Sequence, residues 1–500
     1  MQGANIVVIG AGVGGLTTAA LLAQAGHCVT MLEAGVYPGG SAGTFYHKGY
    51  RFDAGATLAG GFQPGGPHAI IGARLSIEWP IRPTDPAWVV HLPDRAITLD
   101  RTGADVLTAF PAAAPFWANQ RRAADVAWSL AAGGLPWPPC SAAEFVQLAR
   151  AGLAHLPGAL RLLPLALGTA QNWLRRFGLA HDAVFRRFID AQLLISAQTT
   201  AERANGLYSA TALDLARQGV YHVEGGIGGL AQTLADAVTH LGGAVYYKHK
   251  VTGIAVDAGR ATRVHAQIGQ RGTETFPADF VIANLTPWSL NDLLGEGSPA
   301  RLRHEVQRRA PGWGAFVLYL GVEAASLPPD LPDHHQVITT MQGPLGEGRS
   351  IFVSISPAWD AGRAPVGRRA VTVTTHTAVQ PWWDLLAQDK AAYVARRQAY
   401  QDTMLDAIDG ALPGFRRSVA FVMDGTPVTY AHWTHRHLGM VGGFPAVSLF
   451  RSRGPRTGLP NLRLVGDSIF PGQSTAGVTV GAMRVAADVL RVLQQAGTTR

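Results

Sequence analysis

The stretch that decides the fold is "NIVVIGAGVGGLTTAALLAQAGHCVTMLEAG", residues 5–35. Its apolar runs and the turn residues between them predict a strand over 5–9, a helix over 13–25 and a second strand over 29–32. A strand, a glycine-rich turn, a helix and a second strand form the unit that opens a dinucleotide-binding domain. These residues are therefore expected to start such a domain.

The glycine spacing indicates how this unit holds a pyrophosphate. Gly10, Gly12 and Gly15 keep the G-x-G-x-x-G pattern, in which the glycines serve a tight turn, close approach to the phosphates and close helix packing. The free N–H groups and the positive dipole end of the helix then face the pyrophosphate. Glu33 follows the last of these glycines by 18 positions, where an acid meets a ribose 2′-hydroxyl, and this argues against the 2′-phosphate of NADP.

A second glycine pair, Gly39 and Gly40, follows the acid and is followed by Ser41. A nicotinamide-binding domain has no obvious use for this pair, whereas a longer, extended cofactor needs more backbone close to it. The segment 51–57, "RFDAGAT", is predicted to be a strand that delivers Asp53 and Gly55 toward the same groove. An aspartate just before Ala-Gly is also typical of a turn, so a structural role for Asp53 stays open.

The last part of the chain, "NLRLVGDSIFPGQSTAGVTVGAMRVAADVL" at 461–490, supplies the other half of the predicted site. A short strand over 462–465 leads to Asp467, and ligands bind at the carboxyl ends of such strands. Asp467 is expected to accept a hydrogen bond from a ribityl hydroxyl. Gly477 and Val478 begin the final helix, whose amides are expected to face the flavin edge where negative charge develops. FAD is long enough to need both ends of the chain, and FAD is the predicted cofactor.

A third piece lies mid-chain. A glycine-rich entry at 225–229, a helix over 230–241 and a strand reaching Val251 follow one another, and a further strand ends at Asn284. We therefore predict an α/β fold with a glutathione-reductase-like Rossmann FAD-binding domain and a discontinuous α+β substrate domain. The predicted FAD-binding pieces are 1–70, 218–290 and 455–500; the predicted substrate pieces are 71–217 and 291–454. The predicted cofactor-binding residues are Gly10, Gly12, Val13, Gly14, Gly15, Glu33, Ala34, Gly40, Ser41, Gly55, Ala56, Val251, Asn284, Gly466, Asp467, Gly477 and Val478.

Composition narrows the class of partner. The 500 residues are 47% hydrophobic and 15% charged, and the net charge of +8 comes mostly from scattered arginines without a dense basic run. Nucleic acid is therefore not expected as a partner, and an anionic membrane surface is the more natural one. No apolar run reaches about 18 residues, and the apolar stretch 151–179 is predicted to form helices that lie in a membrane interface, with ordinary buried helices an equally good interpretation. Two cysteines suggest neither a disulfide framework nor a metal site.

Three of these stretches, at 7–45, 221–235 and 459–490, resemble the flavin-dependent phytoene desaturase and carotenoid isomerase family within the amine oxidase-like flavoproteins. The stretch "TPVTYAHWTHRHLGMVGGFP" at 426–445 resembles the corresponding stretch of carotenoid 3′,4′-desaturases. The resemblance implies FAD, peripheral attachment to the cytoplasmic membrane, and a long apolar polyene that reaches the flavin through a tunnel. One departure is Ser41, since many members of the wider group have arginine there, so one contact to the cofactor phosphate is expected to be missing.

The resemblance implies desaturation of an acyclic carotenoid by hydride transfer to the flavin, with a quinone or oxygen as electron acceptor. A base must then take a proton, and the candidates from the sequence are Glu224, Asp53, His432 and Asp190, each of which has a structural interpretation as well. Two alternatives stay open. One is a carotenoid cis–trans isomerase that uses reduced FAD. The other is a different flavin oxidase, of the amine or protoporphyrinogen type, although an amine oxidase is expected to have a lysine near the flavin and none lies between Lys250 and Lys390.

Overall fold

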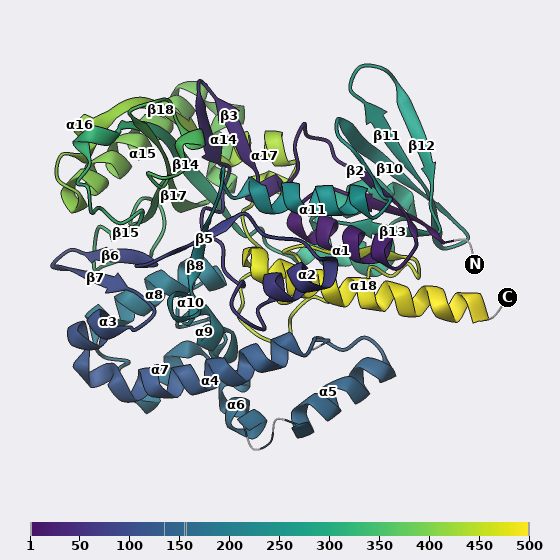
Figure 1. The fold of residues 1–500 in the computed structure, drawn as a ribbon, viewed down its shortest axis with the longest axis horizontal. Coiled ribbons are helices and arrows are strands. Elements are labelled where there is room, and N and C mark those ends of the chain that lie inside the picture. The colour runs from purple at the N-terminus through teal and green to yellow at the C-terminus, as the bar shows by residue number, and fades with distance from the viewer. Residues whose placement is uncertain (1–2, 135, 155, 157, 499–500) are drawn as a thin grey trace.

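The structure, a computed structural model, describes residues 3–134, 136–154, 156 and 158–498. A parallel sheet and a seven-stranded mixed sheet dominate it, with helices packed around both (Figure 1).

The parallel sheet has the strand order β19-β13-β1-β2-β9, and every neighbouring pair in it runs parallel. Its strands are β1 (Asn5–Ile9), β2 (Cys28–Leu32), β9 (Ala244–Tyr246), β13 (Phe280–Ala283) and β19 (Leu462–Leu464). The central strand β1 is a continuous apolar run with Ile6, Val7, Val8 and Ile9 all buried. Such a run is typical of a parallel strand that is covered on both faces.

Helices cover one face of this sheet. Helix α1 (Val13–Gln24) packs against both α11 (Gly228–His240) and α18 (Ser474–Thr498) (Figure 1). A three-stranded antiparallel sheet packs on the other side, formed by β10 (His249–Asp257), β11 (Arg260–Ile268) and β12 (Thr273–Pro277). This arrangement confirms the predicted Rossmann-like α/β class. All five parallel strands come from the pieces predicted to bind FAD, although the domain boundaries themselves remain a prediction.

The second sheet has the order β18-β14-β17-β16-β15-β6-β7. Its strands are β6 (Trp88–Leu92), β7 (Arg95–Leu99), β14 (Trp313–Glu323), β15 (His334–Ile338), β16 (Ser350–Ile355), β17 (Arg368–Ala378) and β18 (Val419–Gly425). One cluster of buried side chains joins this sheet to α14 (Gln380–Gln388), α15 (Lys390–Ala411) and α16 (Phe415–Ser418).

A layer of helices lies below this sheet in Figure 1 and has its own apolar core. These helices are α3 (Ala104–Ala109), α4 (Ala114–Ala132), α5 (Ala142–Ala154), α6 (Gly158–Leu167), α7 (Ala170–Arg176), α8 (Ala183–Ala197), α9 (Gly206–Ala212) and α10 (Leu215–Gln218). The other helices and strands lie outside these two sheets and this helical layer: β3 (Thr44–His47), β4 (Tyr50–Asp53), β5 (Ile81–Thr84), β8 (Val220–Val223), α2 (Pro67–Leu75), α12 (Pro287–Leu294), α13 (Ala300–Arg308) and α17 (Pro427–Thr434).

The predicted strand over 51–57 is shorter than expected. Strand β4 ends at Asp53, because its hairpin partner β3 begins at Thr44 and the register pairs these two residues. Beyond this pair the backbone N–H of Ala54 bonds the carbonyl of Gly43, and the chain leaves the hairpin. Gly55 and Ala56 therefore lie in a loop and not in a strand.

A buried ion pair ties the last strand of the parallel sheet to the last helix. Arg463 on β19 donates from Nε to Oδ2 of Asp488 on α18 at 2.6 Å, and both side chains are about 5% exposed. Removing one partner of such a pair leaves a buried charge without compensation.

We predict that Asp488→Ala lowers the free energy of unfolding by about 3–5 kcal/mol, measured by urea denaturation. Asp94→Ala is the control, because Asp94 and Arg95 form an exposed pair whose loss is expected to leave that free energy nearly unchanged. Equal effects of the two substitutions would contradict the role assigned to the buried pair.

Candidate functional site

The glycine loop leaves the first turn of α1 open for an anion. Gly12 is the N-cap of this helix, has an extended conformation and makes no side-chain cap hydrogen bond, and the first turn carries no acid. The N–H groups of the first turn have no partners within the helix, and they suit a phosphate. Gly10 has a φ of +91°, which a glycine adopts without strain.

Three distant parts of the chain meet closely at this loop. A Cβ on Gly14 would lie 2.9 Å from Cγ1 of Val478 and 3.0 Å from the backbone of Gly466. A Cβ on Gly466 would lie 2.6 Å from Oδ1 of Asn284, and a Cβ on Gly12 would collide with the amide of the same asparagine. The Asn284 side chain donates to the carbonyl of Gly10 at 3.3 Å. The structure thus brings these predicted site residues together, with no room for larger side chains.

Glu33 lies at the edge of the same loop. Its Oε2 accepts from the Ala11 N–H and its Oε1 from the Gly35 N–H, both at 2.7 Å. Burial raises the pKa of Glu33, and these backbone hydrogen bonds partly offset that effect. The carboxylate is held in one orientation, with lone pairs left to accept from ribose hydroxyls.

The second glycine pair folds back on the first loop. Gly39 donates from its backbone to the carbonyl of Ala11 at 2.8 Å and forms a parallel bridge with Gly12. Nothing lies within 4 Å of the position that a Cβ on Gly40 would take, so backbone is exposed there to an incoming group. These contacts support a cofactor that extends beyond one phosphate loop.

Ser41, Gly55 and Ala56 lie together, as the predicted site requires. The Ala56 N–H donates to the Ser41 carbonyl at 3.2 Å. A Cβ on Gly55 would lie 2.5 Å from Oη of Tyr430, and the Ser41 side chain hydrogen-bonds this tyrosine. Tyr319 donates from its hydroxyl to the carbonyl of Ala54 at 2.9 Å.

Asp467, predicted to accept from a ribityl hydroxyl, forms an ion pair with Arg436. Its Oδ2 lies 2.9 Å from Nη2 of Arg436, and both side chains are 17% exposed. A Cβ on Gly443 would collide with the Asp467 carbonyl. Gly477, in the first turn of α18, donates from its backbone to Oγ of Ser474 at 3.1 Å.

Three further predicted site residues are Val251, Ala34 and Val13. His249 donates to the Glu33 carbonyl and Lys248 to the Gly35 carbonyl, so the start of β10 runs beside the acid. Val251 is half-buried against the core of the parallel sheet, and Val13 is buried in it. Ala34 is half-buried.

Three residues at the site are not among the predicted cofactor-binding residues: Tyr319, Tyr430 and Arg436. All three come from the predicted substrate piece 291–454. Burial raises the pKa of both tyrosines, so each phenol stays neutral. The stretch 426–445 was singled out from the sequence only because it resembles a stretch of carotenoid 3′,4′-desaturases. The spacing of its residues does not indicate that it contacts the segments predicted to bind FAD.

The catalytic candidates are dispersed. Asp53 is buried and fully engaged: Oδ1 accepts from Thr44 and from the Ile227 N–H, and Oδ2 pairs with Arg363 at 2.9 Å. This is the bonding of a structural carboxylate that joins three segments.

The other candidates lie elsewhere. The side chains of Glu224 and His432 are exposed. Asp190 on α8 is half-buried and accepts from the Ala201 N–H, and burial raises its pKa. Among the described residues no group of three or more His, Cys, Asp or Glu side chains is arranged to hold a metal ion.

The sequence pattern of the flavin containing amine oxidoreductases matches residues 13–490. The chain belongs to this family. Prolycopene isomerase 2 of an Oncidium hybrid cultivar is 30% identical over 517 residues, which cover 97% of this chain and 84% of that protein. The lycopene-forming phytoene desaturase of a Paracoccus species is 26% identical over 97% of this chain and 96% of its own length. An oxidoreductase from Methanosarcina mazei has a similar structure, with a TM-score of 0.66 and 18% identity over 97% of this chain and 100% of its own.

Family membership confirms FAD as the cofactor and an FAD-dependent oxidoreductase as the class of enzyme. The uncapped first turn of α1, the close approach of Gly14 to the Gly466 backbone, and the oriented Glu33 carboxylate fit this cofactor. The assignment of individual residues to FAD remains a prediction.

We predict that Glu33→Arg abolishes FAD retention, because a cation replaces the ribose acceptor and loses the bonds to Ala11 and Gly35. The measurement is the flavin absorption of the purified protein, with far-ultraviolet circular dichroism as a check on folding. Glu78→Arg changes an exposed acid in the same way and is expected to keep full flavin. A full flavin spectrum in Glu33→Arg would refute the prediction.

Proposed function

We propose that the protein is an FAD-dependent carotenoid desaturase that introduces C=C bonds into an acyclic carotenoid, at the C-3′,4′ position. The observation that carries the proposal is the match along 97% of the chain to proteins named for the conversion of carotenoids. FAD, when bound, supplies the hydride acceptor. The chain's own residues orient the polyene and exclude water.

Cis–trans isomerisation of a carotenoid is the second candidate. It is favoured by the higher identity to the prolycopene isomerases, at 30% against 26% for the Paracoccus desaturase. Isomerisation with reduced FAD leaves the mass of the pigment unchanged, and desaturation does not.

An amine oxidase is disfavoured by the positions of the lysines. The four lysines, Lys48, Lys248, Lys250 and Lys390, all have exposed side chains, so none lies in the interior beside the flavin segments.

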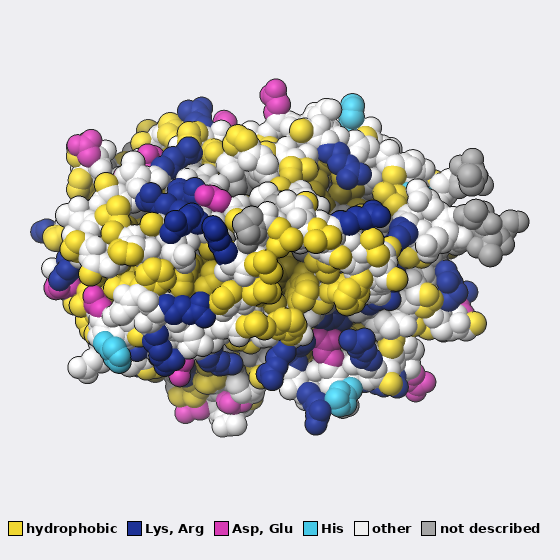
Figure 2. Space-filling model, turned by 90° about the horizontal axis from the view of Figure 1, so that it is seen from below, with side chains coloured by type: hydrophobic (Ala, Val, Ile, Leu, Met, Phe, Trp, Pro, Cys, Tyr) yellow, Lys and Arg dark blue, Asp and Glu magenta, His cyan; other side chains and the backbone are white. Residues whose placement is uncertain are grey.

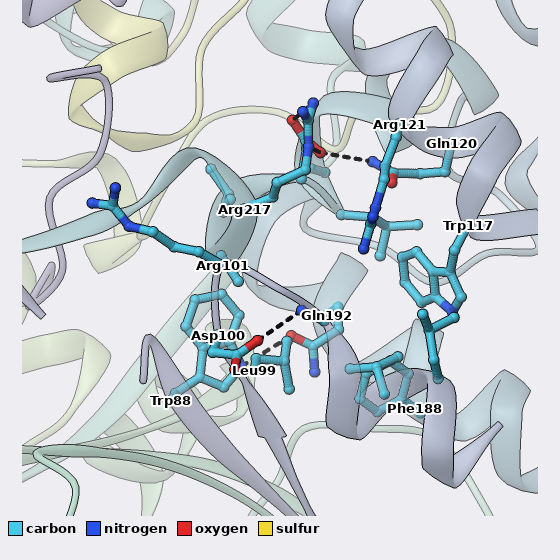
Figure 3. Close-up of a pocket in the computed structure, with 18 residues that line it drawn as sticks. Trp88, Leu99, Asp100, Arg101, Trp117, Gln120, Arg121, Phe188, Gln192 and Arg217 are labelled. Carbon is cyan, nitrogen blue, oxygen red and sulfur yellow. Dashed lines mark hydrogen bonds and ion pairs between the residues drawn. The ribbon is translucent and has the colours of Figure 1, made fainter. Parts of the chain in front are cut away.

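A pocket between the second sheet and the helical layer supports an apolar substrate with a polar end group. Its cavity volume is about 60 Å³, which is too small for a whole polyene and suits an end group at most. Trp88, Trp117 and Phe188 line it together with Gln192 and the charged side chains Asp100, Arg101, Arg121 and Arg217 (Figure 3). Within the described part of the chain the indole Nε1 of Trp117 is buried without a hydrogen-bond partner. This donor suits the oxygen of a hydroxylated carotenoid end group.

Peripheral attachment to an anionic membrane is proposed for the face that carries α5 and α6. A broad apolar area with Lys and Arg around it covers the face seen in Figure 2. Its exposed apolar side chains on and near these helices are Phe145, Val146, Leu153, Leu156, Leu160, Leu163 and Leu167. Arg150 and Arg161 are exposed among them. Such a mixture is typical of helices that lie in a membrane interface.

In the stretch 151–179 the side chains of Leu162, Leu165 and Trp173 are buried, as in ordinary helices, while the exposed leucines of the same stretch support the membrane-interface proposal. Residues 155 and 157 of this stretch lie outside the described residues. No helix in the described part of the chain is long and apolar enough to cross a membrane. The cytoplasmic membrane as the location, and a quinone or oxygen as the electron acceptor, are further parts of the proposal.

The proposed activity is tested by expressing the chain in a bacterial host that accumulates lycopene or hydroxylated acyclic carotenoids. We expect a loss of two mass units per double bond with a red shift of the absorption spectrum. An unchanged mass with a changed isomer profile would establish the second candidate. An unchanged pigment with FAD still bound would contradict both.

We predict that the double variant Leu160→Asp and Leu163→Asp weakens binding to anionic liposomes by about 100-fold, because two exposed leucines no longer enter the apolar boundary. The control is Val366→Asp with Val394→Asp, which changes two exposed valines outside α5 and α6. Sedimentation with liposomes at low salt measures both. Equal binding of the two double variants would contradict the assigned face.

A further inference from the structure

A turn at residues 449–452 carries an exposed aromatic side chain. The Ser452 N–H donates to the Leu449 carbonyl at 3.1 Å, so Phe450 and Arg451 are the two central residues of a β-turn. The Phe450 side chain is 63% exposed, and Arg451 is exposed beside it. The membrane attachment proposed above uses α5 and α6 and leaves this turn unassigned.

The turn lies beside the segment that leads into α5. Nε1 of Trp137 donates to the Leu449 carbonyl at 2.8 Å, and the rings of Trp137 and Phe450 meet edge to face with 5.7 Å between their centroids. A Cβ on Gly454 would lie 3.1 Å from Sγ of Cys140. The turn and the segment before α5 are therefore neighbours, although 312 residues separate Trp137 from Leu449.

Buried charges hold both segments in place. Among the described side chains of α5 only that of Glu144 is buried, and its Oε2 lies 3.3 Å from Nη2 of Arg484 on α18. The same Nη2 donates to the Pro138 carbonyl at 2.6 Å. Arg453, which follows the turn, pairs with Glu305 at 3.0 Å. Because these charged contacts fix the segments, the apolar side chains of α5 and of the turn are left free for another surface.

The charges that these segments expose favour an anionic partner. Residues 137–168 and 440–456 contain a single acid, Glu144, which is buried, whereas Arg150, Arg161 and Arg451 are exposed. Anionic lipid attracts a surface that mixes exposed aromatic, leucine and arginine side chains. A second copy of the chain is a poorer partner, because a two-fold contact places one patch against itself and brings arginines together.

We propose that Phe450 and Arg451 form a second contact with an anionic lipid bilayer, next to the contact made by α5 and α6. The inference rests on the membrane attachment in the proposed function and extends it to a distant segment of the chain. The Phe450 ring enters the boundary between headgroups and acyl chains, and Arg451 binds lipid phosphate at the surface. Two contacts on one rigid body bind a vesicle more tightly than either contact alone and fix the orientation of the protein on it.

The segment that carries the turn also reaches the predicted FAD site. Nε2 of Gln473, just before α18, donates to the Phe444 carbonyl at 3.1 Å, and a Cβ on Gly443 would collide with the Asp467 carbonyl. Seven residues of chain from Gly443 to Phe450 span at most about 25 Å. The proposed lipid contact therefore lies within that distance of residues of the predicted FAD site, on the side of the molecule that meets the bilayer.

The first test is sedimentation of the FAD-loaded, full-length protein with vesicles of phosphatidylglycerol and phosphatidylcholine at low salt. For Phe450→Asp we expect binding to weaken by about 30-fold, because no ring enters the bilayer and the new carboxylate is repelled. Phe450→Leu keeps an apolar side chain and is expected to keep most of the binding.

Tyr46→Asp is the matched control. Tyr46 is 72% exposed and lies on β3, on the opposite side of the molecule from α5 in Figure 1. This variant adds the same charge in place of an exposed aromatic ring, and we expect it to bind vesicles like the unmodified protein. Equal binding of Phe450→Asp and Tyr46→Asp would overturn the proposal.

The second test addresses Arg451. For Arg451→Gln we expect binding to weaken by about 5-fold at low salt, and we expect this difference to disappear at high salt or with vesicles of phosphatidylcholine alone. A difference that depends neither on salt nor on the charge of the lipid would overturn the contact with lipid phosphate.

A contact between two copies of the chain is recognised by size-exclusion chromatography with light scattering. If Phe450→Asp converts a dimer into a monomer and still binds vesicles like the unmodified protein, the turn is a protein interface and the proposal is overturned.

Failure of the proposed function is recognised separately. If Leu160→Asp with Leu163→Asp binds vesicles normally while Phe450→Asp does not, the face of α5 and α6 is wrong and the contact at the turn stands. If the unmodified protein binds no anionic vesicle, both membrane contacts are overturned. The proposed desaturation is decided independently, by the mass of the pigment.

Discussion

The close approach of three backbone segments at Gly14, Asn284 and Gly466 is the constraint on which the rest of the structure depends. Contacts of 2.6 to 3.0 Å from the positions of absent Cβ atoms leave no space for side chains. Gly14 therefore packs against the backbone of Gly466, and Gly466 packs against the side chain of Asn284. These contacts lie at the carboxyl ends of parallel strands, where ligands bind in such sheets. The predicted FAD site draws on both ends of the chain, and in this account an acid and a glycine-rich helix start occur late in the sequence because they form its second half.

Side chains from the substrate part complete the site. Tyr430 contacts Ser41 and Gly55, and Arg436 pairs with Asp467. These contacts join α17, which carries Tyr430, and the loop after it, which carries Arg436, to both halves of the predicted cofactor region. We therefore expect a change in the predicted substrate piece 291–454 to affect residues of the predicted FAD site through two polar contacts. The Asp467–Arg436 pair also neutralises a carboxylate beside the predicted flavin position.

The sequence was sufficient for the parallel sheet and the glycine loop because both depend on local pattern. Ile6 to Ile9 form an apolar run of strand length, and Gly10, Gly12 and Gly15 have a spacing with a known geometric cause. Long-range pairing has no such local signal. The partnership of Asp53 with Arg363 spans 310 residues, and that of Tyr319 with Ala54 spans 265, so neither could be predicted. In the stretch 151–179 some leucines are buried and others are exposed, because one face of each helix packs against the core. Apolar composition alone does not determine which face that is.

The central claim is that these segments form one FAD site. The most direct measurement is the cofactor released by denaturing the purified, full-length protein, identified by chromatography and quantified against protein concentration after saturation with added FAD. The account predicts non-covalent FAD in stoichiometric amount and no retention of NADP under the same conditions. A protein that stays free of flavin after saturation, while folded by circular dichroism, would contradict it.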